Sequence, residues 1–281
     1  MTVRPVDTVR SPAGRRGPKI VVPRSLCHVD MLSWDADTYD RHAVPHVRWG
    51  QQTLARLSLS GTETVLDFGC GTGRDVVRLL DALPNGRVIA VDGSPVMLAR
   101  LRQRLAHRLE RVEIIQADLR QPLPVVTPVD AVMSVATLHW LPDHEAVFSH
   151  IATVLRSGGR FAAEAGGEGN LAAVLAAVAR ARPDLRHITE PARNRRTFAG
   201  VAETARNLER AGFIDIDVDL VTNSMSVPVD MFETVLATVV LVPEVSALPA
   251  AERPAFVRAV ADAIGQPVID WVRLRLSATR S

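Results

Sequence analysis

The sequence predicts an α/β protein with a doubly wound, seven-stranded and mostly parallel sheet. Three observations support this. Short apolar runs alternate with helical apolar periods between residues 64 and 165, as in strand–helix–strand units. A glycine turn follows the first apolar run, and an isolated acidic residue ends the second. Two later segments alternate apolar and polar residues, as partly buried strands do, and a long helical stretch separates them.

Five parallel strands and the helices between them come first along the chain. The expected strands cover residues 64–68, 88–91, 112–116, 130–135 and 160–165. The expected helices cover residues 74–83, 95 to about 108, and 143–155. Ser94 is suited to cap the second of these helices, and Pro95 to be its first residue, because proline needs no hydrogen-bond partner there.

The remainder departs from this alternation. Helices are expected over 169–182 and 201–211, with Gly212 ending the second, and strands over 213–220 and 271–279. The helical stretch 228–267 is too long for a hairpin loop, so we place it over the C-terminal edge of the sheet as a substrate cover. The expected division is a flexible basic tail (1–24), a helical lid segment (25–62), a cofactor-binding core (63–228), a helical cap (229–267) and a final core strand (268–281).

The turn after the first strand reads VLDFGCGTG over residues 65–73. A dinucleotide-binding turn needs glycine at its first, third and sixth positions, so that a pyrophosphate can sit on bare amides and the helix can pack closely. Counted from Gly69, the sixth position is Arg74. The spacing therefore favours a different nucleoside.

S-adenosylmethionine matches the turn better, because it carries no phosphate and presents an ammonium and a carboxylate beside a sulfonium cation. Gly69, Gly71 and Gly73 permit close backbone approach to such a ligand, and Asp67 offers a nearby carboxylate. Asp92, at the tip of the next strand, can accept hydrogen bonds from both ribose hydroxyls. The alternative is a glycine turn in an unrelated α/β protein.

Three ordered segments, DFGCGTG, VIAVDGSPVML and QADL, resemble those of the class I S-adenosylmethionine-dependent methyltransferases. The aromatic residues Trp34 and Tyr39, the segment LHWLPDH (138–144) and the helical insertion are similar to the trans-aconitate methyltransferase branch. The resemblance implies transfer of a methyl group from S-adenosylmethionine to a small-molecule acceptor, a metabolite or natural-product intermediate, with carboxylic acids among the candidates. In-line displacement would proceed mainly through positioning and desolvation.

The cofactor site predicted on these grounds brings together the glycine turn and the ends of neighbouring strands. Its members are Asp67, Gly69, Cys70, Gly71, Gly73, Asp92, Gly93, Met97, Asp118, Leu119, Ser134 and Tyr39. Met97 and Leu119 would provide apolar faces around adenine, and Asp118 would accept from its exocyclic amine. Met97 also lies on the apolar stripe of its helix, so a core position is the alternative.

The predicted substrate side consists of Trp34, His139 and Trp140. His139 follows the fourth strand at the ligand-binding edge and is the candidate general base, with a shape-filling role as the alternative. Trp140 would line the pocket or belong to the core. Trp34 and Tyr39 would close over the methionine end or simply pack an N-terminal helix on the sheet. His144 is expected to be exposed.

Composition excludes several other classes of protein. The formal net charge is +2 and aromatic residues make up 4%, so neither a basic face nor aromatic platforms indicate nucleic-acid binding. No apolar run is long enough to span a membrane. Cys27 and Cys70 lie far apart, and with His139 and His144 five residues apart no metal site is expected. A cytoplasmic location and a possible homo-oligomer complete the expectation.

Two further hypotheses about the protein stay open. The protein could bind the cofactor for a non-methylating or coupled reaction such as a cyclisation, or it could be a non-catalytic scaffold. The arginine-rich loop 182–196 could clamp an anionic acceptor, although a solvated loop is the interpretation we favour, because the chain uses arginine at nearly every basic position.

Overall fold

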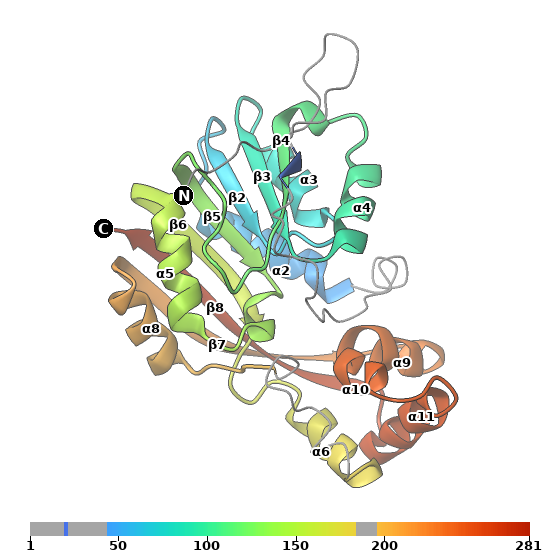
Figure 1. Cartoon of the computed structure of the whole chain (residues 1–281). Coiled ribbons are helices and arrows are strands. Elements are labelled where there is room, and N and C mark those ends of the chain that lie inside the picture. The colour runs from blue at the N-terminus through green and yellow to red at the C-terminus, as the bar shows by residue number, and fades with distance from the viewer. Residues whose placement is uncertain (1–19, 22–43, 184–195) are drawn as a thin grey trace, which may run out of the picture.

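The computed structural model describes residues 20–21, 44–183 and 196–281. Within this part of the chain one eight-stranded sheet has the order β1-β4-β3-β2-β5-β6-β8-β7 (Figure 1). Its strands are β1 (Ile20–Val21), β2 (Thr64–Phe68), β3 (Arg87–Asp92), β4 (Val112–Gln116), β5 (Val129–Val135), β6 (Leu155–Gly166), β7 (Phe213–Ser226) and β8 (Val268–Arg280). Strand β8 is antiparallel to both β6 and β7, and all other neighbours are parallel. The predicted seven-stranded, mostly parallel sheet is confirmed.

Strand β1 is the exception to the predicted order. It pairs in parallel with β4 at the edge of the sheet, Ile20 opposite Ile114. It lies inside the tail 1–24, which the sequence places outside the fold, and that boundary is corrected here. Trp34 and Tyr39 lie outside the described residues.

The helices occupy both faces of the sheet and one end of it. They are α2 (Val44–Arg56), α3 (Arg74–Ala82), α4 (Pro95–Arg104), α5 (His144–Val154), α6 (Ala172–Ala181), α8 (Val201–Arg210), α9 (Val229–Val235), α10 (Val242–Ser246) and α11 (Arg253–Ile264), with short turns η2 (Leu109–Arg111), η3 (Leu138–Trp140) and η5 (Leu236–Val240). Ser94 caps α4 as predicted, its hydroxyl accepting from the Met97 amide at 3.4 Å. Gly212, with φ 83°, follows the end of α8.

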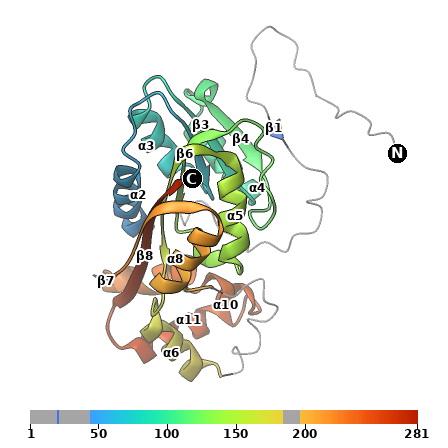
Figure 2. The same ribbon diagram turned by 90° about the vertical axis from the view of Figure 1, so that its left-hand side faces the viewer.

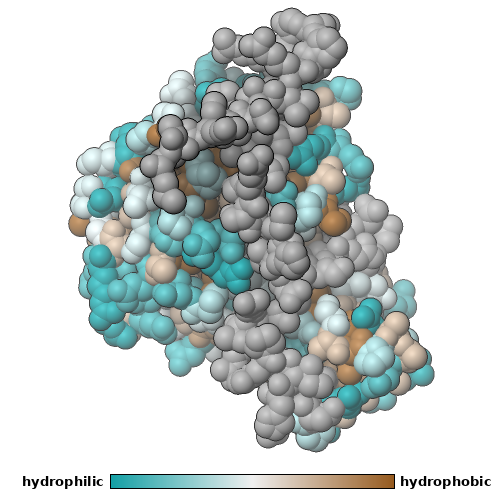
Figure 3. All heavy atoms as spheres, viewed as in Figure 1, coloured by the Kyte–Doolittle hydropathy of each residue, from teal (hydrophilic) through white to brown (hydrophobic). Residues whose placement is uncertain are grey.

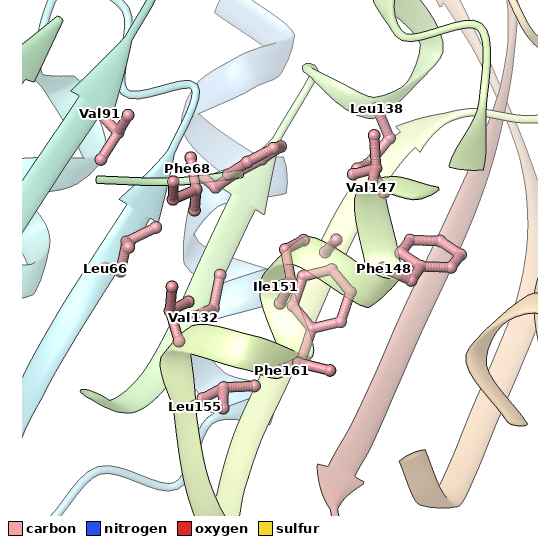
Figure 4. Packing of buried hydrophobic residues seen from close by; sticks show 14 of the residues in the cluster. Leu66, Phe68, Val91, Val132, Leu138, Val147, Phe148, Ile151, Leu155 and Phe161 are labelled. Carbon is pink, nitrogen blue, oxygen red and sulfur yellow. The ribbon is translucent and has the colours of Figure 1, made fainter. Parts of the chain in front are cut away.

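The sheet is buried between two apolar layers, because successive strand residues point to opposite faces. Leu66 and Phe68 of β2 pack with Phe148 of α5 and Phe161 of β6 (Figure 4). Val65 belongs to the opposite layer, which α3 and α4 complete. Figure 2 shows α2 and α3 on one side of the sheet and α5 on the other.

A third apolar cluster lies beyond the sheet and joins the helices that we call the cap, residues 172–181 and 229–264. In it α6 packs against α11, and α9 and η5 pack beside them. The predicted insertion is therefore helical, as expected, but α6 joins it from an earlier part of the chain. Trp49 of α2 and Trp271 of β8 connect this cluster to the core.

Strand β8 changes the face that it buries along its length. The odd-numbered residues from 269 to 273 are buried in its first half, and the even-numbered residues from 274 to 278 in its second. The first set faces the cap cluster through Ile269 and Trp271, and the second faces the core through Leu276 and Ala278. One strand thus supports both the core and the cap.

The surface mixes hydrophilic and hydrophobic residues, with hydrophilic ones gathered over the side that carries α5 and α8 (Figure 3). None of the helices in the described ranges combines the length and the apolarity needed to cross a bilayer.

Candidate active site

The glycine turn between β2 and α3 is held on the end of β3 by main-chain hydrogen bonds. The amides of Gly69 and Cys70 both donate to the Val91 carbonyl, at 2.8 and 3.0 Å. Gly69, Gly71 and Gly73 have φ values of 83°, 51° and 80°, a left-handed region that favours glycine. The sequence therefore forms a tight turn whose backbone faces the C-terminal edge of the sheet.

The three glycines serve different purposes. A Cβ on Gly69 would lie 2.1 Å from Thr137 Oγ1, and one on Gly73 would lie 2.8 Å from Leu101 Cγ. A Cβ on Gly71 would meet no atom within 4 Å. The first and third glycines thus allow protein packing, whereas the second leaves an open side on which a ligand can approach the backbone.

Asp92 ends β3 beside this open side. Its Oδ2 accepts from the Gly71 amide at 2.9 Å, and its Oδ1 accepts from the Ser94 amide at 2.8 Å. Burial raises the pKa of Asp92, although these amides act in the opposite direction. Each carboxylate oxygen can accept further hydrogen bonds, so the position suits two ribose hydroxyls.

Asp67 is buried at the end of β2. Its Oδ2 has no hydrogen-bond partner among the described residues. Burial raises its pKa well above the ordinary value, and the nearby Asp75 and Asp92 add to the effect. A bound cation would relieve this accumulation of acidic groups, so the ammonium and sulfonium of S-adenosylmethionine fit the orphaned oxygen and the open glycine side. The sequence offered no sign of Asp75, which reaches the site because Gly50 of α2 leaves room for its carboxylate.

The remaining predicted adenine-side residues have varied surroundings. Met97 is buried on α4, and Leu119 packs against the edge of the core cluster. Contact of either residue with adenine stays a prediction. Asp118 accepts from Arg120 through both carboxylate oxygens, at 2.8 and 2.7 Å. Burial tends to raise the pKa of Asp118, but these hydrogen bonds outweigh it and lower the pKa. The Gly93 carbonyl accepts from the Gln116 side chain at 3.4 Å.

Ser134 and Cys70 have structural surroundings. Ser134 is completely buried and donates its hydroxyl proton to the Phe68 carbonyl at 2.9 Å, joining β5 to β2. We therefore regard it as a positioning residue instead of a ligand. Burial raises the pKa of the Cys70 thiol well above its usual value, so this cysteine is a packing residue of the turn.

A cavity of about 30 Å³ lies between the core and the cap. It is lined by His46, Trp49, Ala136, His139, Trp140, Val239, Trp271 and Arg273. Ala136 has φ 55°, and its neighbour Thr137 lies against Gly69, so the cavity is next to the glycine turn. A strained non-glycine residue here is typical of a functional site.

His139 is buried in the lining of this cavity, and its ring nitrogen Nδ1 accepts a hydrogen bond from the Gly166 amide at 3.2 Å. An amide can only donate, so the neutral ring carries its proton on Nε2. Burial lowers the pKa of His139 well below its usual value, and Arg273 adds to this. The ring is thus a hydrogen-bond donor with its lone pair occupied, and the prediction of a general base has no support in this geometry.

His144 is buried, so the prediction of an exposed position was wrong. Its Nε2 lies 2.9 Å from the Leu138 carbonyl, and its ring packs on Phe148. The N-terminus of α5 is pressed against η3, which buries the ring. His144 therefore supports the wall of the cavity from behind.

The other wall of the cavity combines two indoles and a buried ion pair. Trp49 and Trp271 meet edge to face, with ring centroids 5.4 Å apart, and among the described residues neither indole N–H has an acceptor. The Arg273 guanidinium lies 3.7 Å from the Trp49 ring centroid. Its Nε is 3.6 Å from Glu164 Oε1, and both side chains are only 2% exposed. Burial raises the pKa of Glu164, although Arg273 opposes this effect.

Sequence reasoning missed these four residues. Arg273 stands on the polar side of an alternating strand, beside Arg275, and its burial depends on the cap covering that side. The scarcity of tryptophan, four in the chain, was the one available signal for Trp49 and Trp271. Glu164 was placed correctly on a strand, but its partner could not be identified.

The described ends of the arginine-rich loop contact the cap. Arg196 forms a buried ion pair with Glu244 at 3.0 Å, and Arg182 an exposed one with Glu252 at 2.9 Å. Arg196 is buried in an ion pair, so it is neither a solvated loop residue nor a free clamp for an anion. Residues 184–195 of the loop lie outside the described ranges. Within the described segments no group of three or more His, Cys, Asp or Glu residues could hold a metal ion.

Comparisons with known proteins agree with this geometry. A family model described as a methyltransferase domain matches residues 65–159. Trans-aconitate 2-methyltransferase of Azoarcus sp. (strain BH72) is 39% identical over 129 residues, which are 46% of this chain and 49% of that protein. The chain thus spans about half the length of the curated relatives it matches.

Solved structures extend the likeness in fold to most of the chain. The YcgJ protein of Bacillus subtilis superposes with a TM-score of 0.59 at 15% identity, covering 84% of this chain and 99% of that one. The [4+2]-cyclase SpnF gives 0.54 at 17% identity, covering 83% of this chain and 80% of that one. Residues 65–159 therefore match a methyltransferase domain, and most of the chain shares the fold of these solved structures.

Proposed function

We propose that the protein transfers the methyl group of S-adenosylmethionine to a small-molecule acceptor. One observation supports the proposal: the glycine turn, in which Gly71 has an open side and donates to Asp92, packs through Gly69 on Thr137, and the neighbouring Ala136 lines the cavity. In this proposal the glycine turn would hold the donor and the neighbouring cavity would admit part of the acceptor, both at the C-terminal edge of the sheet, where ligands bind in open α/β sheets.

Positioning and exclusion of water are the main contributions of the chain. When bound, S-adenosylmethionine supplies an electrophilic methyl group. Asp92 would hold its ribose and Asp67 would balance its charge, while the Trp49 and Trp271 rings would take up space that water could otherwise fill beside the acceptor. Alignment alone provides effective molarities of roughly 10⁵ M or more. Because the His139 lone pair is occupied, the best acceptor is one that needs no deprotonation.

The lining of the cavity supports an acceptor that presents an oxygen anion. The Trp49 and Trp271 indoles, His139 Nε2–H and Arg273 can only donate hydrogen bonds. A carboxylate accepts from several donors at once and attacks without losing a proton. A carboxylic acid is consistent with the name of the relatives that this chain matches over about half of their length, trans-aconitate 2-methyltransferase.

A labelling experiment tests the proposal. The full-length protein is incubated with radiolabelled S-adenosylmethionine and either a metabolite extract or a panel of small carboxylic acids that includes trans-aconitate. A labelled product of low mass is expected. Label found only in protein or RNA would reject the proposed small-molecule methyl transfer. Consumption of substrate without release of S-adenosylhomocysteine would favour the cyclisation alternative. A scaffold would give no heat with either cofactor form in calorimetry.

The double variant Arg273→Met/Glu164→Gln tests the acceptor class. It removes both charges of the buried Arg273–Glu164 pair at once, so that neither charge is left without its partner. We expect the KM for a carboxylate acceptor to rise by roughly tenfold or more, because hydrogen bonds to charged groups contribute about 1.5–3 kcal/mol. The Kd for S-adenosylhomocysteine should change little. An unchanged KM would exclude Arg273 from acceptor binding.

A further inference from the structure

The ion pair between Arg196 and Glu244 joins the segment before α8 to the cap. Arg196 Nη1 and Nη2 lie 3.0 Å from the two carboxylate oxygens of Glu244. Arg196 Nη2 also donates to the Val240 carbonyl of η5. The two side chains are 7% and 4% exposed, so this two-pronged contact is held in one geometry and protected from water.

The same segment also grips the opposite wall of the cavity. The Thr197 amide donates to the His139 carbonyl at 2.9 Å. The Arg196 guanidinium lies 5.5 Å from the Trp140 ring centroid, and the Phe198 ring lies 6.1 Å from that of His139. On the cap side, Val240 directly follows Val239, which lines the cavity. One ion pair therefore connects both sides of the acceptor cavity.

We propose that Arg196 and Glu244 are positioning residues that fix the cap against the His139–Trp140 wall and thereby set the shape of the acceptor cavity. Neither residue is part of the cavity lining, so both act through their neighbours. Loss of one partner leaves a buried charge without compensation, and the cap must move away from the wall to let water reach it. The name of the acceptor rests on the proposed function, but the coupling between wall and cap does not.

The chain offers a matched control in Arg182 and Glu252. This ion pair joins the residue that follows α6 to the residue before α11, at 2.9 Å, but its side chains are 30% and 50% exposed. Neither residue lines the cavity. Exposed pairs contribute little, so its loss should leave the wall unaffected.

Hydrogen–deuterium exchange on the full chain saturated with S-adenosylhomocysteine tests the coupling without an acceptor. The amides of Trp140 and Leu141 report on the wall, since they donate to the Thr137 and Leu138 carbonyls at 2.9 Å. Arg196→Glu and Glu244→Arg should each speed exchange at residues 138–141 and 236–246 by roughly tenfold. The double charge swap should restore part of the protection, because it recovers the ion pair but not the hydrogen bond to the Val240 carbonyl, and Arg182→Glu should leave the wall unchanged. Glu244→Gln, which keeps the shape, serves if a charge reversal unfolds the protein.

Methyl transfer to trans-aconitate, used as the probe acceptor, provides the second readout. The single variants should raise KM more than they lower kcat, while the calorimetric Kd for S-adenosylhomocysteine stays within about twofold. Faster exchange confined to the cap would overturn the proposal, because the pair would then stabilise the cap alone. Lack of rescue by the charge swap would also overturn it. A wild-type protein that binds no S-adenosylhomocysteine would refute the proposed function but leave the exchange result interpretable.

Discussion

The proposed cofactor edge and the proposed acceptor cavity are built by different means. The cofactor edge comes from one stretch, residues 67–94, whose main chain provides most of the contacts: Gly69 and Cys70 bond to Val91, and Asp92 bonds to Gly71 and Ser94. The cavity comes from α2, the β5–η3 turn, the cap and β8, and side chains line it. Backbone sites are specified by local sequence, whereas side-chain cavities depend on distant segments meeting.

Alanine substitutions at Gly71 and Gly69 should have different effects, because Gly71 has an open side and Gly69 packs on Thr137. Gly71→Ala places a methyl group where no protein atom lies within 4 Å. We expect the free energy of unfolding to fall by only about 1 kcal/mol, the strain of a left-handed alanine. The methyl group occupies the side on which the cofactor approaches, so calorimetry should show affinity for S-adenosylhomocysteine reduced on the order of 100-fold.

Gly69→Ala is the contrasting variant, because its Cβ would lie 2.1 Å from Thr137 Oγ1. Chemical unfolding should show a loss of stability of about 1–3 kcal/mol from overpacking, on top of the left-handed strain. Gly69→Ala/Thr137→Ala should recover part of this loss. If both alanine variants lowered stability and affinity equally, the distinction between the two glycines would be wrong.

A carboxylate at the end of β2 opposite the glycine turn should make the fold sensitive to acid. Glu63 accepts from the amides of Ser60, Gly61 and Thr62 at 2.7, 2.8 and 3.0 Å. Burial alone would raise its pKa, but these hydrogen bonds outweigh it and lower the pKa from 4.5 to about 2. The resulting stabilisation is present above pH 4.5 and is lost as the pH falls through about 2.

Glu63→Gln measures this contribution. Urea unfolding at pH 7 should show a loss of about 2 kcal/mol, less than the full value of the shift because solvent screens part of it. The difference between wild type and variant should shrink steadily as the pH is lowered from about 5 toward 2. A difference that did not depend on pH would show that Glu63 acts through packing instead.

The smallest effect is expected in the cavity wall, at His139. A general base contributes about 10²–10⁴-fold to the rate, but a neutral donor much less. His139→Gln should therefore slow methyl transfer by less than about tenfold. Because its pKa is lowered, His139 stays neutral from pH 6.5 upward, and the pH profiles of wild type and variant should be parallel there. If the rate of the wild type fell below about pH 6.5 and that fall were absent in the variant, the hypothesis of a general base at His139 would be restored.

Much of the core could be predicted from the sequence because its signals are local. Apolar periodicity located the seven main strands, Ser94 capped its helix, and Gly212 ended another. The glycine turn was identified from the spacing of its glycines together with the two segments that follow it in order. Each of these features depends on residues within a few positions of one another.

The features that could not be predicted depend on tertiary contacts. Arg273 is buried because the cap covers one face of β8 in its first half, and the alternation of the strand cannot reveal that. His144 is buried because α5 begins against η3. Strand β1 is only two residues long, too short for a periodic pattern, and α6 joins the cap through α11, far along the chain.

Calorimetric titration of Asp92→Asn with S-adenosylhomocysteine tests the central claim most directly. Asparagine keeps the shape of the side chain but offers one acceptor oxygen where aspartate offers two, and the Gly71 and Ser94 amides compete for it. We expect the affinity to fall by at least roughly 30-fold in a variant that stays folded by circular dichroism. An affinity equal to that of the wild type would contradict it, because the ribose would then be bound elsewhere.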